Sequence, residues 1–286
     1  MAEISASLVK ELRERTGAGM MDCKKALQES GGSLEEAVDF LRRKGLSKAA
    51  KKAGRVTSEG VISVKSAPDR GAAALVEVFC ETDFVARSEH FKAFAAAAAD
   101  KVFTNRPVDA AALAALTGDD LHALIATLGE NMSVGRFVFY EAAQPGIVES
   151  YVHSNGKIGV LVEVGTGTAA ARDRAELREL AHNLALQAAA TGAVALDRAS
   201  LDPALLERER AIYRQKTLDE GKPANIVEKI VEGGIQKFCK EVCLLEQAYI
   251  RDDKVAVKSL IDACAATLKD TVTVRRFTRL RLGEHG

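Results

Sequence analysis

Residues 81–87, ETDFVAR, hold the side chains best suited to act on a ligand or a partner. Strand-forming residues precede this stretch and an alanine-rich run follows it, which predicts a turn from a strand into a helix. Thr82 is well placed to cap that helix, and Asp83 would lie at the positive end of the helix dipole. Phe84 stands in the same first turn, where it either packs under the sheet as a core residue or faces solvent or a partner.

Other residues that could do chemistry form no recognisable centre. Cys239 and Cys243 lie four positions apart on a predicted helix and could share a metal, but a buried face of small residues is the favoured interpretation. His153 is expected at the exposed end of a strand, where a single imidazole is more typical of a surface residue than of a catalyst. The chain carries no phosphate-binding loop, dinucleotide fingerprint, nucleophile elbow or zinc signature. We therefore expect no enzyme activity, no metal and no cofactor.

Composition narrows the class of protein further. A chain of 286 residues suffices for about two domains, and its 40 basic and 40 acidic residues argue against duplex nucleic acid or an anionic membrane as the main partner. The five cysteines contain no CxxC pair and fit reducing conditions. The N-terminus lacks the apolar segment of a signal peptide, and no apolar run approaches the ~20 residues of a membrane span. These features predict a protein of the cytosol or of an organelle matrix. We favour a cytoplasmic location, without membrane or direct nucleic-acid contact.

Three short helices are predicted in residues 1–45. Glycines end the first two, and SLEE from Ser33 forms a capping box that begins the third, which is expected to end before Gly45. A bundle this small is only marginally stable, and we expect it to keep an apolar face for a partner. Residues 46–58 are then predicted to form an exposed basic linker, for which a solvated tether is favoured over a nucleic-acid contact.

The rest of the chain contains an internal repeat. LVEV occurs at residues 75–78 and again at 161–164, which are 86 positions apart. The segments SVGRF at 133–137 and TVRRF at 273–277 are 140 positions apart. Each repeat is predicted to form a hairpin, a helix and a closing strand. The expected fold class is therefore α+β, with a three-helix module followed by two related subdomains with antiparallel sheets.

We expect the first subdomain to span residues 59–142 and the second to span residues 143–286. The second repeat is longer by 54 residues, the difference between the two offsets of 86 and 140 positions, and this insertion predicts a helical hairpin around residues 200–240. One helix of the hairpin carries an apolar stripe that must be covered by the body, a partner or a second copy of the chain. The stripe consists of Ile226, Val227, Ile230, Val231 and Phe238.

The repeat also separates contact residues from scaffold residues in the stretch 81–87. Ala169 and Ala170 stand at the positions that match Asp83 and Phe84, 86 residues later. A pair of residues needed to build the repeated unit should recur, whereas a pair needed for one contact need not. The Asp-Phe pair is therefore predicted to serve a contact.

Two long stretches, LRERTGAGMMDCKKAL at residues 12–27 and EVFCETDFVAR at residues 77–87, resemble the signature segments of the elongation factor Ts family. Members of that family are guanine-nucleotide exchange factors for elongation factor Tu. YVHSNGKIGVLVEV at 151–164 and GKPANIVEKIVEG at 221–233 are similar to later blocks of the family, in the same order. The resemblance covers nearly the whole chain. It implies a ubiquitin-associated-like N-terminal module, two related α+β subdomains, and a helical hairpin often used for dimerisation.

The resemblance also implies roles for particular residues. In the family, a Thr-Asp-Phe-Val turn enters the nucleotide domain of GDP-bound elongation factor Tu and displaces Mg²⁺, so that GDP leaves and GTP can bind. The N-terminal module grips the same domain, and the histidine before the second hairpin is expected to touch the partner as well. The turn corresponds to Thr82, Asp83, Phe84 and Val85, and the other contacts correspond to Leu12, Met20, Met21 and His153.

The chain departs from the family pattern in three respects. Phe79 stands where asparagine is usual, which removes a polar side chain expected to order the turn, and Gly135 stands where the second repeat keeps an arginine, Arg275. The chain also ends soon after its closing strand, so we expect it to lack the C-terminal helical module of some relatives. The alternative class of function is a non-catalytic binding module, which would read a ubiquitin-like fold through residues 1–45 or act as a ribosome-associated RNA binder through the basic linker.

Overall fold

The computed structural model describes residues 4–284. Residues 1–3 and 285–286, the outer ends of the predicted segments 1–45 and 143–286, lie outside the described residues. The described chain combines helices with small antiparallel sheets, which confirms the predicted α+β class.

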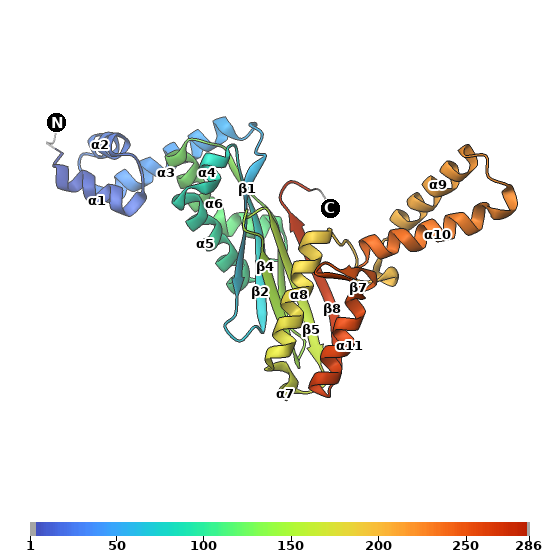
Figure 1. Ribbon diagram of the computed structural model, residues 1–286. Coiled ribbons are helices and arrows are strands. Elements are labelled where there is room, and N and C mark those ends of the chain that lie inside the picture. The colour runs from blue at the N-terminus through green and yellow to red at the C-terminus, as the bar shows by residue number, and fades with distance from the viewer. Residues whose placement is uncertain (1–3, 285–286) are drawn as a thin grey trace.

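Three helices come first: α1 (Ala6–Thr16), α2 (Met20–Glu29) and α3 (Leu34–Lys52). The hydroxyls of Ser5 and Ser33 accept hydrogen bonds from backbone amides in the first turns of α1 and α3, as expected of N-caps. The three helices enclose an apolar core of their own, which includes Leu12 and Leu27. α1 and α2 lie apart from the rest of the molecule, and α3 leads from them to the body (Figure 1).

α3 is longer than the sequence suggests. Residues 46–52, expected to begin a linker over 46–58, instead continue the helix past Gly45. Gly45 is a point of close packing and not a stop, because a Cβ there would lie only 3.4 Å from the main-chain oxygen of His122 in α6 (Ala110–Leu128). The basic residues of this segment therefore lie on a helix that contacts the body.

The first sheet has the strand order β1-β2-β3 and is antiparallel. Its strands are β1 (Glu59–Ser66), β2 (Ala72–Cys80) and β3 (Met132–Glu141). The short helix α4 (Asp83–Arg87) follows β2, and α5 (Glu89–Asn105) and α6 then cover the outer face of the sheet (Figure 1). Buried alanines of α5, including Ala95, Ala98 and Ala99, let this helix approach the sheet closely.

The second sheet repeats this arrangement with the order β4-β5-β8. Its strands are β4 (Gly146–Val152), β5 (Ile158–Thr166) and β8 (Val272–Arg281), and its helices are α7 (Ala169–Arg172), α8 (Ala175–Thr191) and α11 (Val257–Leu268). A register irregularity adjoins Glu77 in β2 and Glu163 in β5, two positions 86 residues apart. The repeat seen in the sequence thus extends to the pairing of the strands.

The two sheets lie face to face, with helices on both outer sides (Figure 1). A separate apolar core fills the space between the sheets and includes Ile62 and Leu75 from the first sheet and Leu161 and Leu280 from the second. This layering of helix, sheet, sheet and helix leaves the strand ends and the turns after them free to form a functional surface.

The predicted hairpin consists of α9 (Pro203–Asp219) and α10 (Ala224–Val242), which pack on each other and project from the body (Figure 1). Short elements join the hairpin to α8 and α11: η1 (Arg198–Ser200), η2 (Leu244–Glu246), β6 (Ala248–Tyr249) and β7 (Asp252–Ala256). Val227 and Val231 of the apolar stripe are buried, whereas Ile226 and Ile230 are exposed. The stripe is therefore covered only in part by its own chain.

α6 qualifies the expectation that no segment approaches the length of a membrane span. Its 19 residues are long and apolar enough to cross a membrane, by length and composition alone. The helix contacts α3, α5 and β3 of the same chain and carries Asp119 and Asp120. Since core helices of soluble proteins pass the same test, α6 is weak evidence for a membrane span.

Candidate functional site

The turn after β2 presents Phe84 to solvent. Thr82 has an extended backbone, and its hydroxyl accepts a hydrogen bond from Val85 N (3.4 Å), which caps α4 as predicted. Val85 and Ala86 pack against the core of the first sheet. The side chain of Phe84 points away from that core and is 83% exposed. Of the two alternatives for this residue, the exposed one is therefore correct.

A carboxylate from the opposite loop holds this turn. Glu130 lies between α6 and β3, and its Oε1 accepts a hydrogen bond from the Thr82 hydroxyl (2.6 Å). Its Oε2 accepts from the backbone amides of Glu81 (3.1 Å) and Thr82 (3.0 Å). All three donors lie just before Phe84, so the carboxylate fixes the chain that carries the exposed ring.

Asn131, the neighbour of Glu130, extends the network to the segment that follows α3. Its backbone amide donates to the carboxylate of Glu81 (2.5 Å), and its buried side chain donates to the main-chain oxygen of Arg55 (2.7 Å). No local sequence pattern marks Glu130 or Asn131, so neither residue was expected at this site. Val56, directly after Arg55, is an exposed apolar residue.

Asp83 is already paired in the free protein. Its carboxylate lies 3.0 Å from the guanidinium of Arg87, one turn further along α4. The Arg87 side chain is largely exposed and that of Asp83 is about half exposed, so the pair contributes little to stability and exchanges readily for another partner.

Phe79, which departs from the family pattern, fills the space beside Gly135. A Cβ at position 135 would collide with the ring of Phe79. In the second sheet the large and the small residue change places. Gly165 in β5, which matches Phe79, leaves room for the guanidinium of Arg275 in β8, which matches Gly135. Each site therefore holds one large and one small residue. With Phe79 at this position, the turn after β2 is held by hydrogen bonds to Glu130.

The N-terminal residues divide into two kinds. Met20 and Met21, at the start of α2, are 57% and 74% exposed and are available to a partner. Leu12 is fully buried in the core of the three N-terminal helices. The expected direct contact through Leu12 therefore needs correction: Leu12 faces the inside of the three-helix bundle and supports it from there.

His153 lies in the exposed turn between β4 and β5. Lys157 of the same turn pairs with Glu59 of β1 (2.8 Å), and Glu59 lies opposite Cys80 at the end of β2. The structure thus brings His153 to the same end of the two sheets as residues 82–85, although it belongs to the second repeat.

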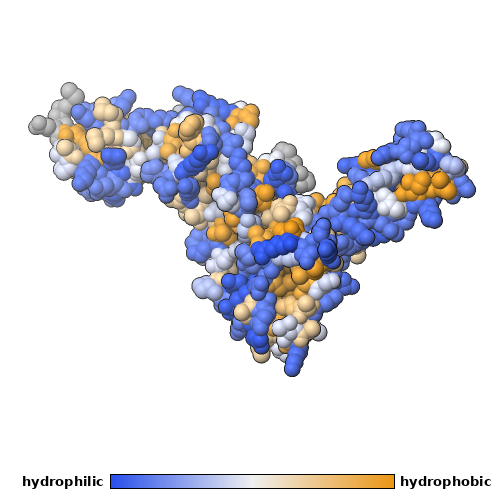
Figure 2. Space-filling model, in the orientation of Figure 1, coloured by the Kyte–Doolittle hydropathy of each residue, from blue (hydrophilic) through white to orange (hydrophobic). Residues whose placement is uncertain are grey.

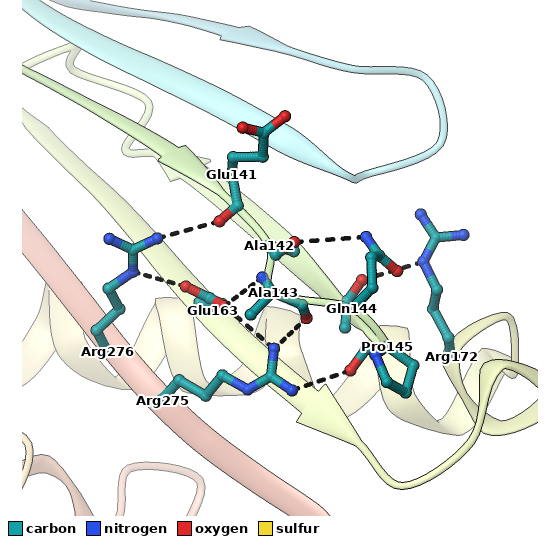
Figure 3. Close-up of polar contacts among 10 residues, drawn as sticks. Glu141, Ala142, Ala143, Gln144, Pro145, Glu163, Arg172, Arg275 and Arg276 are labelled. Atoms are coloured by element: carbon teal, nitrogen blue, oxygen red, sulfur yellow. Dashed lines mark hydrogen bonds and ion pairs between the residues drawn. The ribbon is translucent and has the colours of Figure 1, made fainter.

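Figure 3 shows how the connection between the two sheets, residues 141–146, is held. Arg275 and Arg276 donate hydrogen bonds to main-chain oxygens of this connection, and both contact the buried Glu163 (3.3 and 2.6 Å). Burial raises the pKa of Glu163, but hydrogen bonds from Ala143 N and the two arginines outweigh it, so the net pKa lies below the ordinary value. The ionised carboxylate and the arginines fix one sheet relative to the other.

The described residues 4–284 contain no group of three or more His, Cys, Asp or Glu side chains arranged to hold a metal ion. Cys239 and Cys243, the one pair that the sequence suggested, are buried in the hairpin core. A cavity of about 370 Å³ lies between the N-terminal helices and α6, and its walls are both polar and apolar. Phe84 does not line this cavity, and the distinguishing feature of the surface around it is the exposed ring.

Comparisons with known proteins show that the chain is similar to one family over nearly its whole length. A family model described as Elongation factor TS matches residues 81–284. A protein named elongation factor Ts from Desulfovibrio desulfuricans is 54% identical over 283 residues, which cover 99% of both chains. Proteins of the same name from Nitratidesulfovibrio vulgaris and Lawsonia intracellularis are 53% and 50% identical, covering 98% of this chain and 96% and 99% of theirs.

The fold, the presented turn and these matches define the class: the chain is a translation elongation factor. Within that class it belongs to the elongation factor Ts family.

Proposed function

We propose that this chain binds GDP-bound elongation factor Tu, displaces Mg²⁺ from its nucleotide site and promotes GDP release, so that GTP can bind. The observation that carries the proposal is the exposed ring of Phe84 on a turn held by Glu130 and Thr82. An aromatic side chain held in place before binding loses little conformational freedom on insertion into a partner, which makes it an effective anchor.

The proposed exchange involves no bond chemistry by the chain. The factor accelerates release if it binds the partner without GDP and Mg²⁺ more tightly than the partner that holds them, because the coupling between two ligands is reciprocal. A divalent cation supplies much of the local positive charge at a diphosphate, so its loss weakens nucleotide binding. GTP then rebinds and expels the factor by the same linkage.

Each residue of the turn has a distinct part in this proposal. Phe84 is the wedge that enters between elements of the partner. Asp83 leaves its exposed pair with Arg87 and competes for polar groups around the metal, at little cost. Thr82 and Val85 place these two residues through the cap and through contact with the core.

Further contacts would supply affinity and orientation. We assign them to Met20 and Met21 on the N-terminal helices and to His153 beside the turn, with Leu12 acting indirectly as a core residue. We further propose that the chain is organised as an N-terminal module, a first subdomain over 59–142 and a second over 143–286, and that it acts in the cytoplasm without direct nucleic-acid contact.

The projecting hairpin is proposed to pair with a second copy of the chain. Its exposed apolar side chains are Ile212, Leu218, Ile226 and Ile230. Figure 2 shows apolar surface gathered near the far end of the hairpin. Burial of these side chains between two copies would remove the apolar area that the monomer leaves in water.

The decisive experiment measures the release of a fluorescent GDP analogue from elongation factor Tu with and without this protein. Phe84→Ala should bind but accelerate release poorly. Val108→Ala is the matched control, because Val108 is 91% exposed and follows the opposite end of α5. Unchanged GDP release on mixing with the wild-type protein would overturn the proposal and favour a passive binding module.

A further inference from the structure

We propose that Glu130 is a positioning residue for exchange: its contact with Thr82 holds the turn so that Phe84 is presented in one orientation. This inference rests on the proposed function for its consequence, but the contact itself and its effect on the mobility of the ring are independent of any partner.

Both carboxylate oxygens of Glu130 accept hydrogen bonds from the turn, although the residue is only partly buried. One oxygen of Glu130 accepts from the Thr82 hydroxyl at 2.6 Å, and the other accepts from two successive backbone amides, of Glu81 and Thr82. Hydrogen bonds to an ionised acceptor are roughly twice as strong as neutral ones. The Thr82 hydroxyl donates to Glu130 and at the same time accepts from Val85 N, so the carboxylate orients the cap.

The second repeat contains the same contact without the ring. Thr168 caps α7, and its hydroxyl and backbone amide donate to Asp270 at 2.6 and 2.9 Å. Thr82 and Thr168 are 86 positions apart, and Glu130 and Asp270 are 140 apart, which are the two offsets of the repeat. The hydrogen bond from the Thr168 hydroxyl, together with backbone amides, lowers the pKa of Asp270 below its ordinary value.

The repeat therefore offers a comparison inside one molecule. The carboxylate and the capping threonine belong to the scaffold, since both repeats have them. Phe84 is specific to the first repeat, because Ala170 stands at the matching position. Only in the first repeat does loss of the carboxylate affect an aromatic ring that projects into solvent.

The exchange experiment compares Glu130→Ala with Asp270→Ala. Each removes the carboxylate from one capping threonine, so both should lower the melting temperature by a similar few degrees. Glu130→Ala should lower the maximal rate of GDP release at saturating factor by about tenfold, within the usual range of coupling between sites. The half-saturating concentration should change far less, because the rest of the interface remains. Asp270→Ala should leave both parameters at the wild-type values.

The readout separates positioning from stability. Equal loss of the maximal rate in the two variants would assign the effect to general destabilisation and overturn the proposal. A wild-type maximal rate for Glu130→Ala would overturn it as well. Glu130→Gln, which keeps one acceptor oxygen, serves if the alanine variant does not fold, and an intermediate rate is expected.

A second measurement requires no partner. The chain has no tryptophan, so Phe84→Trp introduces a single indole whose fluorescence anisotropy reports the motion of this side chain. Adding Glu130→Ala should lower the anisotropy, and adding Asp270→Ala should not. Unchanged anisotropy with Glu130→Ala would overturn the inference. If the wild-type protein fails to accelerate GDP release, the proposed function fails, and the anisotropy still decides whether Glu130 orders the turn.

Discussion

Arg136 donates a hydrogen bond from Nη2 to the main-chain oxygen of Arg281 (2.9 Å), across the boundary between the two sheets. Arg276 donates in the same way to the main-chain oxygen of Glu141 (3.1 Å). The two donors are 140 positions apart, and so are the two acceptors. The two halves of the core thus exchange one contact reciprocally, as the subunits of a two-fold dimer do.

Each of these arginines also binds a buried glutamate of its own sheet. Arg136 contacts Glu77 at 2.7 and 2.8 Å, and Arg276 contacts Glu163 at 2.6 Å. The arginines therefore connect a buried charge in one sheet to the strand end of the other. These contacts hold the two sheets against each other.

Phe84→Ala should leave the free energy of unfolding within about 0.5 kcal/mol of wild type, because the exposed ring buries little area in the free protein. Phe91→Ala, seven residues later, should cost about 3–5 kcal/mol, since Phe91 is fully buried. Urea unfolding measures both. A large loss of stability with Phe84→Ala would indicate that Phe84 is a core residue.

Glu163→Gln should lower the free energy of unfolding at pH 7 by about 2 kcal/mol, because it leaves the Ala143 amide and the two arginines without their buried, ionised acceptor. The pKa of Glu163 is lowered in the folded state, so the stabilisation is present above the ordinary value of about 4.3 and is lost as the pH falls through the lowered pKa.

Unfolding titrations of wild type and Glu163→Gln from pH 7 downward check this sign. The two stabilities should converge as the pH falls from the ordinary glutamate pKa through the lowered pKa of Glu163. Glu89→Gln, at an exposed pair with Lys92, should show no such convergence. A difference that grows on acidification would contradict the assignment.

Gly135→Ala should destabilise the protein by about 2 kcal/mol, because the new Cβ collides with the ring of Phe79. In a Phe79→Ala background the same change should cost less than about 0.5 kcal/mol, since the space is then free. A double-mutant cycle by thermal unfolding measures the coupling. Additive effects would show that Phe79 does not occupy the space beside Gly135.

No cysteine should react quickly with a thiol reagent in the folded protein at pH 8. All five are buried, and burial raises the pKa of Cys80 and of Cys243 to about 12. Absorbance with an aromatic disulfide should show five thiols only after denaturation. Ser154→Cys, in the exposed turn beside His153, is the positive control. One fast thiol in the wild-type protein would indicate that a core opens readily.

Ile226→Glu combined with Ile230→Glu should abolish self-association through the hairpin, because the two exposed side chains would place charge in the proposed contact. Sedimentation velocity over a range of concentrations measures the effect. Val108→Glu, away from the hairpin, should leave the association unchanged. A wild-type protein that stays monomeric at every concentration tested would refute the proposed pairing.

Local signals in the sequence were enough to predict much of the fold. The N-cap at Ser33 and the strand-forming LVEV segments each determine structure within a few neighbouring residues. The offsets of 86 and 140 positions then located the repeated sheets and the inserted hairpin. The absence of the Asp-Phe pair from the second repeat indicated that Phe84 serves a contact, and its exposure agrees.

The tertiary structure decided which distant residues support that contact. Thr82 and Glu130 are 48 positions apart, and Arg136 and Arg281 are 145 apart, so no local pattern could connect them. It also decided that Leu12 faces inward. Helical periodicity identifies one apolar stripe on a helix, but which of its residues are covered depends on the neighbouring helices. The sequence by itself therefore determined the helices and strands and singled out Phe84. How the turn that carries Phe84 is held was determined only by folding, because folding brings remote donors and acceptors within hydrogen-bond distance.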